Sequence, residues 1–186
     1  MKKRPLEIGN AINRVFPFSN GFPDWVPAKA VEARGLLYPA WPLRETQVRA
    51  VARAAAEVGE ESCYLSCVDR ASDQDALQDF ELATFSVERY RELGDAFSLL
   101  EHVVVSQAGS WGVFVQHDGA AVVAGPGNFV RSVYESLSPV DEQAAELAAG
   151  VLALEIPKYE TWLGEFLDEI LGSETAARVI GSARSA

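Results

Sequence analysis

Residues 101–137 read EHVVVSQAGSWGVFVQHDGAAVVAGPGNFVRSVYESL, and this stretch predicts a three-stranded antiparallel meander followed by an amphipathic helix. Asp118-Gly119 lies between two apolar runs. This is a strong hairpin signal, because a two-residue type I′ turn needs positive φ at both central positions. A turn of that kind would pair Val115 with Val122. The last strand then leads through a glycine-rich turn into the helix.

The register of the first two strands depends on the turn before Trp111. A three-residue loop at 108–110 would pair Val105 with Val113, whereas a one-residue slip would scatter the apolar side chains over both faces. The three-residue loop collects six of them on one face, namely Val103, Val105, Trp111, Val113, Val115 and Val122. We expect the sheet to be covered on both sides, at least in part, because the other face is also apolar, with Val104, Phe114 and Val123.

The whole chain has the composition of an ordinary soluble domain. Its 186 residues suffice for one domain with a sizeable core, and 48% of them are apolar, with a mean hydropathy near zero. No apolar run approaches the roughly 20 residues that a membrane span needs. The first residues, MKKRPLEIGN, lack the apolar region of a secretory signal. We therefore expect a cytoplasmic protein that does not contact membranes; the oligomeric state stays open.

Apolar periodicity predicts a single α+β domain over residues 1–186. Its core is an antiparallel sheet of four or five strands that includes the meander at 102–124. Helices are expected to pack on this sheet at 43–58, 128–136, 140–155 and 159–171.

The two ends of the chain differ in character. Residues 1–42 are irregular, aromatic and proline-rich, with a short helix expected at 28–33 and ended by Gly35. We interpret this segment as a lid packed over the core, with a ligand cleft or a partner surface as the functional alternative. Residues 139–180 form C-terminal helices, and the tail from Gly181 is expected to fray.

The two cysteines lie in residues 62–69, which predict a strand. On a strand, Cys63 and Cys67 share one face about 13 Å apart, too far to form a disulfide. The chain has only two histidines, too few to complete a four-ligand metal site around these thiols. We therefore expect buried free thiols, no disulfide framework and no metal.

Any histidine-based chemistry must use His102 or His117. In the predicted register, His117 lies across from Glu101 and next to Asp118. Such a cluster could act as an acid/base group or a weak metal site, but a solvated ion pair is the interpretation we favour. We therefore assign no catalytic residue and expect no cofactor, with Glu101, His117 and Asp118 as the candidates for a site.

The net charge of −11 is concentrated in two acidic tracts, the first at residues 57–81 and the second at residues 141–174. Such tracts repel phosphates and argue against nucleic-acid binding. They suit a basic protein partner, or solubility alone. The candidate partner-binding residues are Asp69, Asp73, Asp75 and Asp79 in the first tract, and Glu160, Glu165, Asp168 and Glu169 in the second.

The segment from Trp111-Gly112 through Ala124-Gly125 to Phe129 resembles a pattern in small bacterial proteins of unknown function. In that pattern, a strand opening with Trp-Gly is followed by a hairpin, a second strand, a glycine-rich turn and a helix. Such proteins are similar in size and acidity to the immunity proteins of bacterial polymorphic toxin systems. The resemblance covers residues 111–135 only and implies no active-site residue.

These observations lead to two functional hypotheses. The first is a non-catalytic protein-binding module, with an immunity-like or antitoxin-like inhibitor of a basic toxin as its most specific form. The alternative is a small-molecule-binding protein or hydrolase with a pocket under the aromatic N-terminal segment, in which Glu101 and His117 are the polar groups.

Overall fold

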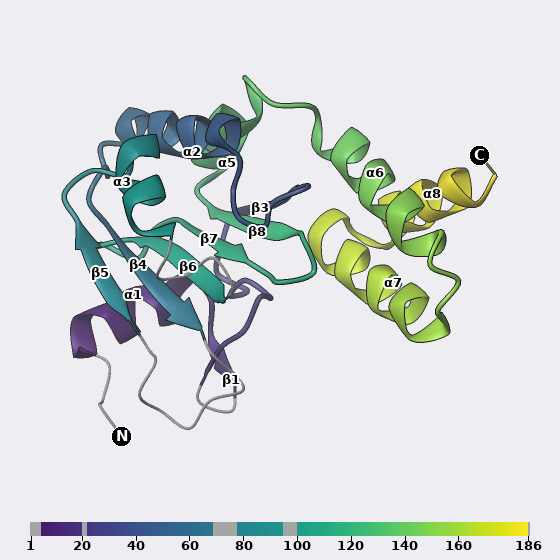
Figure 1. Ribbon diagram of the computed structural model, residues 1–186, viewed down its shortest axis with the longest axis horizontal. Helices are drawn as coiled ribbons and strands as arrows, with labels where there is room; N and C mark the ends of the chain where they lie inside the picture. The colour runs from purple at the N-terminus through teal and green to yellow at the C-terminus, as the bar shows by residue number, and fades with distance from the viewer. Residues whose placement is uncertain (1–4, 20–21, 69–77, 95–99, 186) are drawn as a thin grey trace.

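The computed structural model describes residues 5–19, 22–68, 78–94 and 100–185. These residues form an α+β fold around one open antiparallel sheet, with strand order β3-β8-β7-β6-β4-β5 (Figure 1). The sheet has six strands, so the expected four or five was too few. They are β3 (Ala33–Leu37), β4 (Cys63–Val68), β5 (Asp79–Leu82), β6 (Glu101–Ser106), β7 (Gly112–Val115) and β8 (Ala121–Gly125).

The unexpected strand is β3, in the segment for which a short helix was predicted at 28–33. It pairs antiparallel with β8, and Leu36 and Leu37 are fully buried. Gly35 does not end a helix but gives space to the ring of Tyr134, which occupies the position that a β-carbon at Gly35 would need. The Tyr134 hydroxyl donates a hydrogen bond to the Leu36 carbonyl over 2.6 Å. A tight contact between strand and helix therefore explains this glycine.

The meander forms, but both of its predicted registers are wrong by one residue. Val103 pairs with Phe114, and Phe114 pairs with Val122. In each connection, a glycine with positive φ lies at the end of the turn and not at its centre. These glycines are Gly109 (φ 68°) and Gly119 (φ 87°). This arrangement is typical of longer hairpin loops rather than of a two-residue turn.

The register shift moves Val103 and Val105 to the face opposite Val104, Val113 and Val123. Because both sets are fully buried, the expectation that the sheet is covered on both sides is confirmed.

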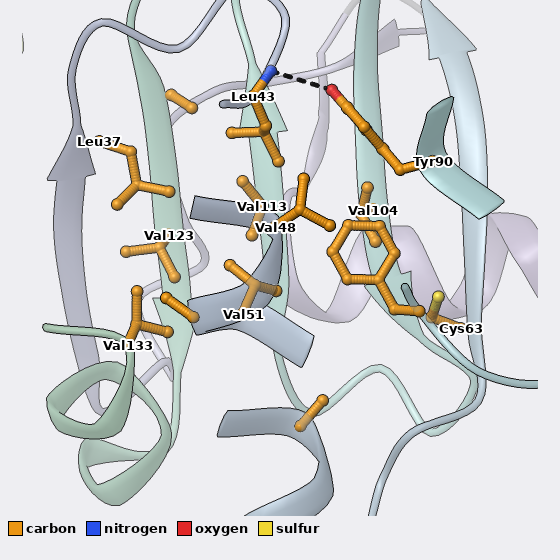
Figure 2. Close-up of a cluster of buried hydrophobic side chains, with 14 of the residues drawn as sticks. Leu37, Leu43, Val48, Val51, Cys63, Tyr90, Val104, Val113, Val123 and Val133 are labelled. Atoms are coloured by element: carbon orange, nitrogen blue, oxygen red, sulfur yellow. Dashed lines mark hydrogen bonds between the residues drawn. The ribbon is translucent and has the colours of Figure 1, made fainter. Parts of the chain in front are cut away.

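One face of the sheet is covered by α2 (Glu45–Glu57), α3 (Val87–Glu92) and α5 (Gly127–Tyr134). Helices α2 and α5 were expected at closely similar positions. Ser86 caps α3 by accepting a hydrogen bond from the Arg89 amide. Figure 2 shows side chains from α2 and the sheet meeting in this core, among them Val48, Val51 and Val113.

The opposite face packs against α1 (Leu6–Val15), and α6 (Val140–Leu152) and α7 (Pro157–Leu171) pack at its β3 edge. Helix α8 (Ser173–Arg184) packs on α6 and α7. A small hairpin of β1 (Phe18–Ser19) and β2 (Phe22–Pro23) follows α1. Helices α6 and α7 contact the edge strand β3 (Figure 1).

Helix α8 continues through residues 181–184, which were expected to fray; Arg184 pairs with Glu160 on α7. Among the described helices, none has the length and apolar character needed to cross a membrane.

Candidate functional site

Glu101, His117 and Asp118 come together at the turn between β7 and β8, as the sequence indicated. Nδ1 of His117 lies 2.9 Å from Oε1 of Glu101 and 3.6 Å from Oδ1 of Asp118. The Glu101 side chain is only 12% exposed, whereas that of His117 is 67% exposed. The cluster therefore has one carboxylate held against the protein and an imidazole open to solvent.

The backbone fixes the turn that carries this cluster. The Gln116 amide donates to the Ala120 carbonyl over 2.9 Å, and the Ala40 amide donates to the Gly119 carbonyl over 2.7 Å. The second bond ties the turn to the segment after β3, where the Trp41 ring meets the His117 ring edge to face at 6.3 Å. The aromatic segment thus supports the cluster from one side.

A cavity of about 250 Å³ opens between α2 and α3, below the usual size range of a drug-sized ligand site. Its walls are mainly apolar, with Glu45 and Arg91 paired at 3.1 Å among the lining residues. Neither Glu101 nor His117 lines this cavity. It is bordered instead by Tyr90, whose hydroxyl contacts the other histidine.

His102 forms a buried polar pair that the sequence analysis did not identify. The Tyr90 hydroxyl lies 2.7 Å from Nε2 of His102 and accepts a hydrogen bond from the Leu43 amide (Figure 2 shows the latter). Burial lowers the pKa of His102 to about 4 and raises that of Tyr90. At neutral pH, both groups are uncharged. The pair fills space in the core, and each side chain gives the other a hydrogen-bond partner.

A second cavity, of about 230 Å³, lies between the start of α2 and the start of α6 and has polar walls. Two buried glutamines border it, and both are hydrogen-bonded. Gln143 accepts from the Tyr38 amide, and Gln47 donates to the Pro39 carbonyl. These bonds secure the segment between β3 and α2 against α6, so the polar groups have a structural role.

The two cysteines are buried free thiols, as expected. Both lie on the face of the sheet that packs against α2 and α3. Burial raises the pKa of the Cys63 thiol to about 12, so this group stays protonated and unreactive at neutral pH.

Three of the four candidate acids of the first tract, Asp69, Asp73 and Asp75, lie outside the described residues. Asp79 begins β5 and accepts a hydrogen bond from the Ser66 hydroxyl. At this position, it contributes to strand pairing at the edge of the sheet.

On α7, two of the four candidate acids are engaged within the chain. Glu160 pairs with Arg184 at 2.8 Å, and Glu169 pairs with Arg34 of β3. Glu165 and Asp168 are exposed and have no salt bridge to the described residues. The second tract therefore leaves Glu165 and Asp168 available to a partner.

Sequence reasoning missed an exposed apolar group at the connection between α6 and α7. We call Leu154, Ile156 and Tyr159 the tip. They are 55%, 37% and 38% exposed, and they account for three of the five exposed large apolar side chains among the residues described. The sequence did contain a signal for exposed apolar residues at this connection. Apolar residues lie on both sides of Glu155, directly before Pro157, which starts α7.

The aromatic N-terminal segment packs on the core in the manner of a lid. Phe16 is fully buried and meets Phe114 edge to face at 5.7 Å, and Trp25 packs on Phe166 at 5.1 Å. Trp41 is the exception, because it is exposed beside His117.

Comparisons with protein-family models, with curated proteins and with solved structures find no match to this chain.

Proposed function

We propose that this chain is a non-catalytic protein-binding module that binds a basic protein partner through its C-terminal helices. The observation that carries the proposal is the tip: three exposed apolar side chains lie within six residues of one another, within an acidic part of the chain. From Asp141 to Arg184 the sequence has nine acidic residues against three basic ones.

The tip has the character of the centre of an interface. Leucine, isoleucine and tyrosine side chains bury apolar area on binding, and tyrosine is enriched among residues that dominate binding energy. In Figure 1, the α6–α7 connection lies on the side of the helices turned away from the sheet, where a partner can approach. Lys158 lies 4.8 Å from the centre of the Tyr159 ring.

Four acids on α6 and α7 give these helices a negative charge. Glu142, Glu146, Glu165 and Asp168 are exposed and form no salt bridge within the part of the chain that is described. Exposed carboxylates of this kind attract a basic partner and speed its association, more strongly at low salt. A cytoplasmic inhibitor of a basic toxin, similar to an immunity protein, is the most specific form of this proposal.

The test begins with capture of a partner at low salt from cells that contain the chain, and with co-expression of the product of the adjacent gene. The identified partner is purified, and its affinity is measured by calorimetry at low and at moderate salt. We expect Leu154→Ser/Tyr159→Ser to weaken binding by more than about tenfold, or 1.4 kcal/mol. Leu6→Ser is the control, because Leu6 is 78% exposed but lies on α1.

Charge is tested separately. Glu165→Gln/Asp168→Asn should slow association and reduce its salt dependence, while Glu61→Gln/Glu88→Gln, which removes two exposed acids elsewhere, should not. If no purified partner binds, or if both C-terminal variants bind like the parent, the proposal fails.

The second candidate is a small-molecule-binding protein, favoured by the apolar cavity between α2 and α3. A compound that raises the melting temperature of the parent should lose this effect in Val48→Trp, which would fill the cavity. The outcome would separate this candidate from the first, because α2 is remote from the tip.

A further inference from the structure

We propose that Glu101, His117 and Asp118 bind a divalent transition-metal ion such as Zn²⁺ at the turn between β7 and β8. From the sequence alone, a solvated ion pair was favoured over a weak metal site for these three residues. The proposal concerns a site separate from the tip and does not depend on the proposed function.

The donor set is the first argument. Imidazole nitrogen with carboxylate oxygen is a ligand combination that Zn²⁺ and Co²⁺ accept and that Ca²⁺ and Mg²⁺, which favour oxygen ligands alone, do not. One ligand atom from each of the three side chains lies within 4.8 Å of the other two. Three protein ligands leave the remaining coordination position to water, as in open zinc sites.

The spacing of these atoms is the second argument. Ligands about 2.0–2.1 Å from a tetrahedral zinc ion lie roughly 3.3 Å from one another. Nδ1 of His117 lies 2.9 Å from the Glu101 oxygen and 3.6 Å from the Asp118 oxygen, values that fall on either side of this spacing. One oxygen of each carboxylate lies within 4.8 Å of the other. The side chains would have to rotate to admit the ion, which would replace the hydrogen bond between Glu101 and His117.

Backbone hydrogen bonds fix the turn that carries His117 and Asp118. Two backbone hydrogen bonds hold it, and one of them joins Gly119 to Ala40. Glu101 is the first residue of β6, and its side chain is largely buried. Because these elements are ordered in advance, ion binding would not have to supply the free energy of ordering the loop.

The accessible donors of the chain are the third argument. The chain has two histidines and two cysteines. Cys63, Cys67 and His102 are fully buried, and the ring nitrogens of His102 contact Tyr90 and the Leu100 carbonyl. His117 is therefore the accessible imidazole of the folded chain, and it is the one that lies between two carboxylates.

The experiment uses the full chain without a histidine tag. Calorimetry with ZnCl₂ in a non-chelating buffer at neutral pH should show one ion bound per chain. His117→Gln should weaken binding by more than about tenfold, because it removes a ligand outright. Asp118→Asn should also weaken it while keeping a residue that suits the turn, and Glu88→Gln, an exposed acid on α3, should bind Zn²⁺ like the parent.

Proton NMR identifies the ligand directly, because only two imidazoles contribute signals. Zn²⁺ should shift or broaden the His117 resonances and leave those of His102 unchanged, and Ca²⁺ should do neither. Circular dichroism of each variant checks that it is folded. The proposal is overturned if millimolar Zn²⁺ produces no binding heat and no shift, or if folded His117→Gln binds Zn²⁺ as tightly as the parent.

Discussion

The Tyr90 hydroxyl lies 2.7 Å from Nε2 of His102, in the core between α3 and the sheet. Nδ1 of His102 lies 3.2 Å from the Leu100 carbonyl, which can only accept, so this nitrogen carries the proton. Nε2 then accepts the Tyr90 O–H bond, and the Tyr90 oxygen accepts from the Leu43 amide over 3.1 Å. The neutral imidazole is thus required by its surroundings, and its protonation must disturb the core.

We expect the free energy of unfolding to fall as the pH is lowered from about 6.5 to about 4. The unfolded histidine has a pKa near 6.5, whereas burial lowers the native pKa of His102 to about 4. Within this window, the unfolded chain binds a proton that the native chain does not, so stability rises with pH. The contribution of His102 has a slope of at most about 1.4 kcal/mol per pH unit.

Urea unfolding at several pH values in this window would measure the slope. His102→Gln should be less stable than the parent at neutral pH but should show a flatter pH dependence. His117→Gln, which removes an exposed histidine, should keep the parent slope in this window apart from the small effect of its surface ion pair. Equal slopes for His102→Gln and the parent would contradict the prediction.

Removal of the Tyr90 hydroxyl is expected to cost about 1–3 kcal/mol of unfolding free energy, because buried polar groups lose a partner. In Tyr90→Phe, the Leu43 amide and Nε2 of His102 are left without this oxygen. Tyr159→Phe is the control, since Tyr159 is at the exposed tip. Denaturant unfolding at neutral pH would compare them, and equal losses in the two variants would mean that the buried hydroxyl has no special role.

The helices could be predicted well because their apolar residues recur with the helical period. On α7, Leu163, Phe166, Leu167 and Ile170 are all buried, as their spacing requires. Strand β4 could be predicted equally well, and its two cysteines lie on one face as expected. These elements depend on local pattern, which a single sequence contains.

The register of the meander could not be predicted in the same way. Every residue of β7 and β8 is buried, so a one-residue slip exchanges one apolar face for another. The position of the positive-φ glycines within the turns decides between the registers. Gly119 lies at the end of its turn and does not form the centre of a two-residue turn with Asp118. Strand β3 was missed because its partner β8 is remote in sequence.

The candidate cluster was predicted despite the wrong register. His102 pairs with Val115, so Glu101 lies one residue and His117 two residues beyond that pair, and their side chains still meet. The tip was missed for a different reason. Periodicity shows which residues are apolar, but exposure depends on whether another element covers them, and at the α6–α7 connection none of the described elements does.

Trp111→Ala is expected to lower the free energy of unfolding by about 3–5 kcal/mol, the range seen for buried aromatic residues. Trp111 is fully buried and stacks on Phe129 with ring centres 5.0 Å apart. Its indole N–H donates to the Glu60 carbonyl over 3.2 Å. Thermal and urea unfolding would measure the loss, with Trp41→Ala as the exposed control at less than about 1 kcal/mol. Similar losses in the two variants would contradict the placement of Trp111 in the core.

Gly119→Val and Gly119→Ala should both destabilise the fold, because Gly119 has φ 87°, where a side chain costs about 1–2 kcal/mol. A β-carbon at this position would meet nothing within 4 Å, so the expected cost arises from the backbone alone. Valine should cost more than alanine, since branching at the β-carbon adds crowding.

Gly164 provides the matched control for this prediction. It lies inside α7, and a β-carbon there also meets nothing within 4 Å, but its backbone is helical. Gly164→Ala should therefore stabilise the protein by up to about 1 kcal/mol, the difference in helix propensity between the two residues. Opposite signs for Gly119→Ala and Gly164→Ala in the same unfolding assay would locate the effect in the turn conformation. A parent-like melting temperature for Gly119→Val would show that residue 119 does not adopt positive φ, and the register of β7 with β8 would have to be revised.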